Sequence, residues 1–247
     1  MKKALFIIGI TTAILLGLAF LFKTSGILRW HNCPGAANEP GIKTGSYFWV
    51  SSLKKPGRFD FITFERTGYA DYPEANGLTV YRLCGLPGDT LLLKDGILFI
   101  NGKNADKDLN LFNEYKVSLP EEIAKVNHKI QSIDPGDGMP GPGFAVLAIR
   151  DDYIIANLTT EFVQTNKLTC MLWSNDMPDV TDRIGRQWGR PWSIDNFGPL
   201  AIPQDSFFVL GDNRHNALDS RFTGFVARSA IKGTVLRRES GTPDVKK

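Results

Sequence analysis

The side chains that most often supply nucleophiles or metal ligands are few in this sequence. The three histidines, His31, His128 and His215, lie too far apart along the chain to form the spacing of a zinc site. The three cysteines are also widely spaced, and their odd number matches neither a disulfide framework nor a metal site. The sequence therefore predicts no metal centre, and no cofactor is expected.

Two short segments combine glycine and proline with charged residues. This combination is typical of rigid turns that shape a functional site. The first segment, Tyr81–Asp89, reads YRLCGLPGD, and the second, Gly211–Gly224, reads GDNRHNALDSRFTG. Glycine and proline set backbone turns, whereas Asp and Arg can pair across them. A third segment, Trp192–Pro203, reads WSIDNFGPLAIP and leads up to the second one.

These segments resemble the signature segments of bacterial type I signal peptidases, serine peptidase family S26. In that family the first reads K-R-x-x-G-x-P-G-D and the second reads G-D-N-R-x-x-S-x-D-S-R-x-x-G. The resemblance covers roughly residues 1–102 and 191–237, whereas residues 103–190 resemble nothing that we can name. It implies a mainly β fold of twisted antiparallel sheets around a hydrophobic groove, with an inserted smaller region, preceded by one N-terminal transmembrane helix.

The resemblance also implies a serine–lysine dyad, in which the serine hydroxyl attacks the scissile carbonyl and a buried lysine of lowered pKa acts as the base. In the family the serine begins the segment S-M-x-P-T-L-x-x-G-D. The matching stretch here begins at Ala37, because Pro40, Ile42 and Gly45 fall in register with it. Tyr81 occupies the position of the lysine, immediately before the arginine of the first segment.

Two further departures fall on groups that would assist the dyad. Gly35 stands where the family often has a serine that helps to bind the oxyanion, and Ala217 stands where a serine hydrogen-bonds the lysine. The nucleophile, the oxyanion donor, the base and the partner of the base are thus all replaced. Loss of a nucleophile and its base leaves activity several orders of magnitude below the intact enzyme, so no catalytic residue is predicted to be intact.

By contrast, the residues that would shape the site match the family. They are turn formers and candidate ion-pair partners, which hold shape rather than move protons: Pro40, Arg82, Gly85, Pro87, Gly88, Asp89, Asp212, Arg214, Asp219, Ser220 and Arg221. The sequence therefore predicts that the scaffold of the site is retained although its dyad is lost.

Several hydroxyls and one imidazole near these positions could in principle replace the dyad. Ser46 takes the place of the family's aspartate after Gly45, and Ser51 and Ser52 lie on or beyond a predicted strand. We interpret Ser51 and Ser52 as surface hydroxyls, and His215 as an exposed loop residue.

Tyr81 and two of the cysteines also have simpler interpretations than catalysis. A phenol with a pKa near 10 is mostly protonated at neutral pH, so Tyr81 is expected to fill an apolar slot rather than act as a base. Cys84 is interpreted as a small core residue of a strand. Cys33 lies four residues before Ala37 but has no paired base in the sequence.

The elements that must position these residues are predicted to be short strands. In Phe59–Glu65 apolar and polar residues alternate with a period of two, which is typical of a half-buried strand. Lys94–Gly96 and Asn101–Gly102 are hairpin-type turn signals. Further strands are expected at Tyr47–Ser51, Leu78–Cys84, Thr90–Lys94, Ile97–Ile100, Ser206–Leu210 and Ile231–Arg237.

The chain is expected to consist of a discontinuous β core with one insertion. Residues 24–46 show little periodicity, and residues 134–143 contain the glycines and prolines of a loop, whereas a short helix can open at Pro120. The predicted parts are an anchor at 1–23, a core at 24–102 and 191–237, an insertion at 103–190 and a tail at 238–247.

An uncharged apolar segment, Ala4–Phe22, predicts a single membrane span. As a helix, its 19 residues would reach about 28 Å, close to the hydrocarbon thickness of a bilayer. A cleaved secretory signal would have a shorter apolar region and an A-x-A-like site. Positive charges flank the apolar segment on both sides: Lys2, Lys3 and the amino terminus precede it, and Lys23 and Arg29 follow it. By the positive-inside rule this balance favours a cytoplasmic N-terminus, which places the rest on the outer (periplasmic) face of the bacterial inner membrane.

The partners that the sequence predicts are the lipid bilayer and extended peptides. A net charge of +3 without a stripe of Lys and Arg is not the footprint of a nucleic-acid-binding protein. We expect a non-cleaving homologue that binds extended peptides, such as the signal peptides of exported proteins, or an active signal peptidase that it regulates. The alternatives are a peptidase with a different catalytic arrangement and a structural membrane protein with a filled groove.

Overall fold

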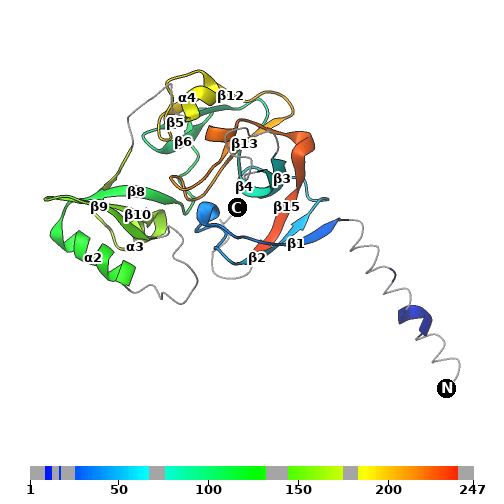
Figure 1. The fold of residues 1–247 in the computed structure, drawn as a ribbon, viewed down its shortest axis with the longest axis horizontal. Helices are drawn as coiled ribbons and strands as arrows, with labels where there is room; N and C mark the ends of the chain where they lie inside the picture. Colours follow the sequence, from blue (N-terminus) through cyan, green and yellow to red (C-terminus); the bar gives the residue numbers. More distant parts are fainter. Residues whose placement is uncertain are drawn as a thin grey trace.

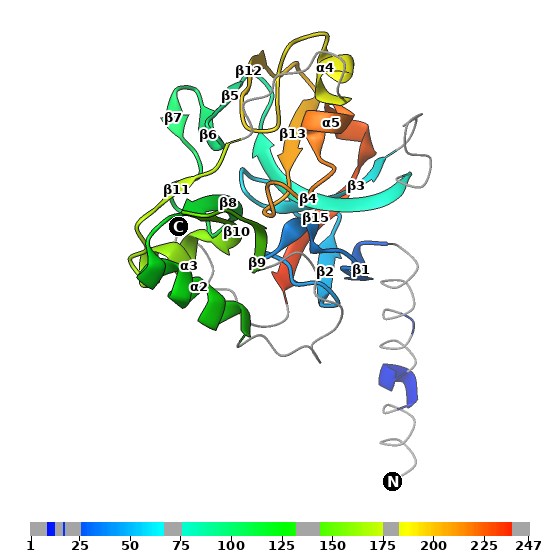
Figure 2. The same ribbon diagram turned by 60° about the vertical axis from the view of Figure 1, so that its left-hand side comes forward.

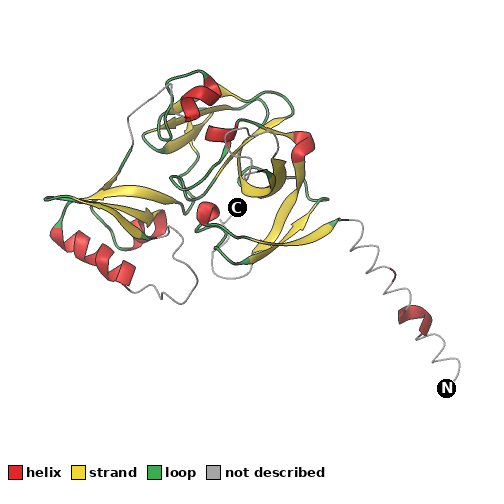
Figure 3. Cartoon of the chain, viewed as in Figure 1, coloured by secondary structure: helices red, strands yellow, loops and turns green. Residues whose placement is uncertain are grey.

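The computed structural model describes residues 9–12, 17, 26–66, 76–131, 144–174 and 183–238. These residues are mainly in strands that pair antiparallel, with a few short helices beside them (Figures 1 and 3). The largest sheet has the order β1-β2-β15-β3-β4-β13-β14. Its strands are β1 (Leu28–Asn32), β2 (Tyr47–Ser51), β3 (Phe61–Arg66), β4 (Gly77–Gly85), β13 (Ser206–Leu210), β14 (Val226–Ala227) and β15 (Ile231–Arg238).

A second sheet has the order β12-β5-β6-β7. Its two tight turns have positive φ at both central residues, 51° and 77° at Asp95 and Gly96 and the same values at Asn101 and Gly102. This backbone geometry matches the twist of a two-residue hairpin and confirms both predicted turns. The strands are β5 (Thr90–Lys94), β6 (Ile97–Ile100), β7 (Lys103–Asn104) and β12 (Phe197–Ala201).

A third sheet, of order β11-β8-β10-β9, lies beside the other two and has its own apolar core (Figures 1 and 2). Val117, Val126 and Leu158 are completely buried in that core. Its elements are β8 (Phe112–Val117), α2 (Pro120–Gln131), β9 (Ala145–Ile149), β10 (Ile154–Thr159), α3 (Thr160–Thr165) and β11 (Cys170–Leu172). The helix predicted to begin at Pro120 is therefore present as α2.

The strands predicted from the alternation of apolar residues are confirmed, most of them to within one or two residues. The largest sheet also contains a strand that the pattern did not predict, because β1 (LRWHN) mixes apolar and polar residues without a clear period. Its Leu28 and Trp30 are exposed at 38% and 43%, and Trp30 contacts Trp49 and Tyr47 of β2. Pairing with β2, rather than burial, therefore makes this segment a strand.

Residues 103–190 contribute to more than the third sheet. The third sheet runs from Phe112 to Leu172, whereas Ile184 packs into the apolar cluster that contains Leu91 and Phe197 of the second sheet. Trp188 joins the same cluster and belongs to α4 (Arg183–Trp188). The chain after β11 thus returns to the main body before residue 191.

The predicted anchor at residues 4–22 falls outside the described residues except for 9–12 and 17. Within the described part of the chain, no helix has both the length and the apolar character that a membrane span requires. The predicted loop at residues 134–143 and almost all of the predicted tail also lie outside the described residues.

Candidate active site

The residues at the two dyad positions and at the position of the lysine's partner come together in space. Ala37 lies in the 3-10 helix η1 (Ala36–Asn38), Tyr81 lies on β4, and Ala217 lies in the loop between β13 and the short helix α5 (Ser220–Thr223). All three belong to one apolar cluster, which we call the Tyr81 cluster. Its buried members are Ile62, Phe64, Tyr81, Leu83, Phe207, Val209, Ala217 and Val226, with Ala37, Leu86, Ala230 and Ile231 packed against them.

Gly211 marks the point where the three positions meet. A methyl group at its Cα would collide with Cβ of Ala217, and it would lie 2.5 Å from the Ala37 carbonyl oxygen and 3.4 Å from the Tyr81 ring. Glycine is therefore the residue that lets the second motif segment approach Ala37 and Tyr81. The register deduced from the sequence thus corresponds to a real neighbourhood in the fold.

Hydrogen bonds fix η1 against the two motif segments. The Asn213 backbone N–H donates to the Ala37 carbonyl at 3.1 Å, and Asn38 Nδ2 donates to the Val80 carbonyl at 2.8 Å. Pro40 follows η1 through a cis peptide bond. The two hydrogen bonds thus hold Ala37 and Asn38 against the motif segments.

Tyr81 fills an apolar slot, as the sequence predicts, and only 5% of the residue is exposed to solvent. Burial raises the pKa of Tyr81 to about 12, and the negative charge of Asp219 acts in the same direction. The charge of Arg66 and hydrogen bonds from Leu218 and Arg66 oppose this rise. At neutral pH the phenol is protonated, so it supplies no base.

The hydroxyls near the site are engaged in local backbone hydrogen bonds. Ser46 Oγ donates to the Lys43 carbonyl at 2.6 Å, and Ser220 Oγ accepts from the Val209 N–H at 3.0 Å. Ser52 is exposed, as expected. The interpretation of Ser51 as a surface hydroxyl is wrong, because Ser51 is buried and its Oγ accepts from the Leu53 N–H.

The positions beside Ala37 also lack an activated group. Gly35 has no side chain and therefore offers no hydroxyl to an oxyanion. It is exposed, and the space that a side chain would occupy is open. Cys33 is buried, and burial raises the pKa of its thiol. Its Sγ donates to the Gly35 carbonyl at 3.3 Å. Cys84 is completely buried, as predicted, and burial raises its pKa to about 12.

Buried ion pairs frame the Tyr81 cluster. Arg82 Nε and Nη2 donate to the two carboxylate oxygens of Asp212 at 2.6 and 2.5 Å, and Arg82 Nη1 donates to the Phe59 carbonyl at 2.9 Å. A side chain at Gly41 would collide with this pair, since its Cβ would lie 2.9 Å from Arg82 Nη2. The first and second motif segments are thus joined by a bidentate charged contact.

Asp219 organises the second motif segment from within. It accepts from Arg221 Nε at 2.9 Å and Nη2 at 2.8 Å, from the Arg221 N–H at 3.1 Å, and from the Gly211 N–H at 3.1 Å. Asp219, Ser220 and Arg221 are completely buried. These contacts are internal to the loop that brings Ala217 to the site.

The remaining motif charges have partners that sequence reasoning did not identify. Arg214 donates to Asp106 at 2.7 and 2.5 Å, and Arg58 donates to Asp89 at 2.8 and 3.1 Å. Asp106 lies in the predicted insertion, outside the motif segments, and Arg58 lies in a turn, so no pattern linked either to its partner. Only the fold brings these side chains together.

His215 is not the exposed residue that the sequence predicts. Its side chain is only 13% exposed, and its Nε2 lies 3.0 Å from the buried carboxylate of Asp195. Glu114 lies near this pair, and burial raises its pKa. The prediction failed because His215 occupies a variable position of the motif, whereas its burial comes from the third segment and from β8.

The described residues form a mainly β protein in which the motif segments gather at one site. The family model described as "Signal peptidase, peptidase S26" matches residues 4–238, so the chain belongs to this family.

Two of its relatives are each 25% identical to this chain over the residues that match. It is 25% identical to signal peptidase I of Buchnera aphidicola over 189 residues, which are 74% of this chain and 55% of the relative. It is 25% identical to signal peptidase I of Bacillus licheniformis over 233 residues, 92% of this chain and 81% of the relative. A signal peptidase I crystal structure from Enterococcus faecalis matches with 22% identity and a TM-score of 0.33, covering 75% of this chain and all of that one. The match to the Buchnera relative therefore spans little more than half of that protein.

Proposed function

We propose that this chain is a non-cleaving member of the signal peptidase family that binds extended peptides of exported proteins beside Ala37. The observation that carries the proposal is the composition of the Tyr81 cluster. Ala37, Tyr81 and Ala217 meet around Gly211, where attack on a peptide bond requires a nucleophile, a base and a partner for that base. Two methyl groups and a protonated phenol perform none of these roles.

A peptide-binding role is favoured by the backbone just before η1. Pro34 and Gly35 are exposed, and Gly35 has the extended conformation of a strand, with φ of −130° and ψ of 161°. An exposed extended backbone can pair with an added peptide strand, as in other proteins that bind peptides by strand addition. The hydrogen bond from Asn38 to the Val80 carbonyl holds the following η1 against β4 even though the dyad is absent.

We place the protein at the outer face of the bacterial inner membrane, held by residues 4–22. The exposed face of β1 and β2 supports this location, because Trp30 packs against Tyr47 and Trp49 and both Trp30 and Tyr47 are over 40% exposed. Trp and Tyr favour the membrane–water interface. β1 begins at Leu28, only a few residues after the apolar segment, so this face must stay near it.

A cleavage assay tests the absence of peptidase activity. The full chain, purified in nanodiscs, is incubated with a preprotein, and release of its signal peptide is followed by mass spectrometry. We expect no release above the level of an Asp212→Ala variant. Release that the wild type shows and the variant lacks would mean that a different catalytic arrangement is at work.

Photocrosslinking tests the peptide-binding role separately. A benzophenone amino acid replaces Gly35, where the added side chain meets no atom within 4 Å, and a matched variant carries it at Gly57. A signal peptide blocked at both ends should crosslink at position 35 and not at position 57. Equal labelling at both positions, or none at position 35, would favour a structural protein with a filled groove.

A further inference from the structure

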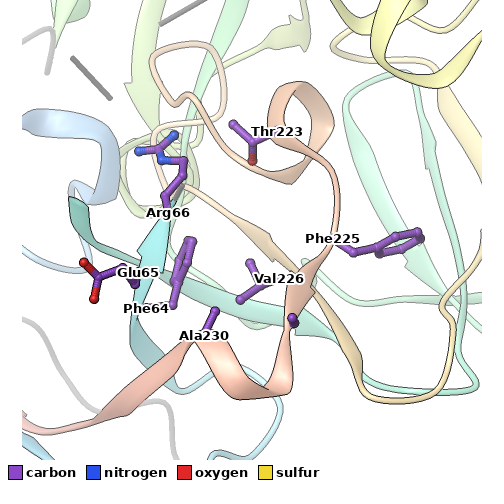
Figure 4. A pocket seen from close by; sticks show the side chains of 8 residues that line it. Phe64, Glu65, Arg66, Thr223, Phe225, Val226 and Ala230 are labelled. Carbon is purple, nitrogen blue, oxygen red and sulfur yellow. The ribbon is translucent and has the colours of Figure 1, made fainter. Parts of the chain in front are cut away.

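A small pocket opens between the end of β3 and the segment that leads into β15. Figure 4 shows Arg66 and Thr223 at one end of the pocket and Ala230 at the other, with Phe64 and Val226 between them. Its volume is about 160 Å³, and Glu65, Phe225 and Ala227 complete its lining. Phe64, Val226 and Ala230 also belong to the Tyr81 cluster, so the pocket lies on the flank of the candidate site.

Arg66 gives this pocket a positive charge, and no carboxylate of the described residues pairs with it. Within the described residues, Arg58, Arg82, Arg214 and Arg221 each pair with an aspartate. Arg66 instead donates through Nη1 to the Leu218 carbonyl at 2.8 Å and through Nη2 to Thr79 Oγ1 at 3.1 Å, and it also hydrogen-bonds the Tyr81 phenol. Its Nε is buried and has no acceptor. A guanidinium in such surroundings favours a carboxylate, with which it forms short charge-assisted hydrogen bonds.

The one acidic residue of the lining does not cancel this charge. Glu65 Oε2 lies 3.4 Å from Lys232 Nζ on the neighbouring strand β15. Glu65 and Arg66 are consecutive residues of a strand, so their side chains point to opposite faces of the sheet. The pocket therefore combines one cationic wall with an apolar floor of Phe64, Val226 and Ala230.

The size of the pocket limits what the floor can hold. An engineered apolar cavity of about 150 Å³ accommodates benzene, so a pocket of this volume takes roughly one Val, Leu or Phe side chain. The last residue of a peptide presents a side chain and a carboxylate from the same Cα, in two directions. An internal Asp or Glu would place its carboxylate at the wall but leave the apolar floor uncovered.

We infer that this pocket binds the free C-terminus of a peptide whose last residue is apolar, with the carboxylate held by Arg66. A free α-carboxylate ends every unmodified polypeptide and every N-terminal fragment that peptide-bond hydrolysis releases, so both kinds of chain carry the group that Arg66 would hold. This inference rests on the proposed function, because both require a peptide ligand. It adds that the protein recognises the C-terminal end of that peptide.

Fluorescence anisotropy of the full chain in nanodiscs tests the inference. The probes are dye-labelled hexapeptides ending in Gly, Val, Leu or Phe, each made as the free acid and as the C-terminal amide. We expect an acid ending in Val, Leu or Phe to bind at least about tenfold more tightly than its amide and than the Gly peptide, as loss of a charged hydrogen bond requires. Equal binding of acid and amide, or no binding of any acid, would overturn the inference.

Three variants locate the binding. Arg66→Gln should remove the difference between acid and amide, and Ala230→Phe should weaken the acids by filling the floor while leaving Arg66 in place. Arg228→Gln is the matched control, because Arg228 pairs with Asp205 on a neighbouring segment, and it should bind like the wild type. An acid preference that survives Arg66→Gln would place the carboxylate elsewhere.

Two further measurements distinguish a peptide ligand from a small carboxylate, and failure of this inference from failure of the proposed function. Isovalerate, a free small acid, should compete only weakly; competition stronger than that of the unlabelled peptide acid would assign the pocket to small carboxylates instead of peptides. Crosslinking of the doubly blocked signal peptide at position 35 needs no carboxylate. If that crosslinking persists while the acids fail to bind, this inference is lost and the proposed function stands.

Discussion

Arg66, at the end of β3, hydrogen-bonds the phenol of Tyr81 on β4, so a guanidinium lies beside the position to which the family motif assigns a lysine. The same side chain donates to the carbonyl of Leu218, next to Ala217. A fixed positive charge therefore borders two of the altered positions. A lysine introduced at position 81 would share this environment.

The charge of Arg66 should affect the pH dependence of a variant in which the catalytic residues are restored. In the variant Ala37→Ser, Tyr81→Lys, Ala217→Ser, burial, the largest influence at position 81, and the like charge of Arg66 disfavour the ammonium form, whereas the charge of Asp219 favours it. We expect burial to dominate, so that the pKa of the new lysine falls and its amine is a base at neutral pH. We expect signal-peptide cleavage to return. Adding Arg66→Gln should move the acidic limb of the kcat/KM profile to higher pH.

The double variant Ala37→Ser, Ala217→Ser is the control, and it should remain inactive because its serine has no base. An unchanged pH profile after Arg66→Gln would show that Arg66 does not act on position 81. Failure of every variant to cleave, with folding intact, would show that the groove has changed as well as the dyad.

The buried pair between Arg82 and Asp212 should be a large contributor to stability. Its side chains are 6% and 1% exposed, so Asp212→Asn leaves an arginine charge buried without a counter-charge. We expect a loss of about 3 kcal/mol in the free energy of unfolding, measured by urea denaturation with tryptophan fluorescence. Lys54→Met breaks the exposed Lys54–Asp60 pair and should cost less than about 1 kcal/mol.

Tyr81 should make the folded state sensitive to alkali. Its pKa is raised to about 12 in the fold, against about 10 when unfolded, so its contribution to stability is present below pH 10 and is lost as the pH rises toward 12. The absorbance difference between wild type and Tyr81→Phe at 295 nm should therefore show no ionisation near pH 10. In denaturant the same difference should titrate near pH 10, and a native titration there would contradict the burial of the phenol.

Asp89 should make the folded state sensitive to acid. Burial by itself raises its pKa, but hydrogen bonds from Arg58, the Leu86 N–H and Asn101 together lower it. Its stabilising contribution is thus present above the unfolded pKa of about 3.9 and is lost as the pH falls through the folded value. At pH 7, Asp89→Asn should lower stability by about 1–2 kcal/mol, and this difference should shrink below about pH 4.

Much of this protein could be derived from local patterns. The strands β2, β5, β6 and β13 follow from alternating or continuous apolar runs between turn residues, because the side-chain period of a strand is written directly in the sequence. The motif spacing also located Ala37, Tyr81 and Ala217, which the fold brings to one cluster. Motif spacing can locate these positions because the alignment of a residue within a motif depends only on the order of residues along the chain.

The partners of the charged side chains were decided by the tertiary structure. Arg214 and Asp106 lie 108 residues apart, and Arg66 reaches Leu218 across 152 residues. Neither pairing leaves a local pattern, because each depends on which loops the sheets bring together. For the same reason the burial of His215 and Ser51, the strand β1 and the pocket beside Arg66 were visible only once the chain had folded.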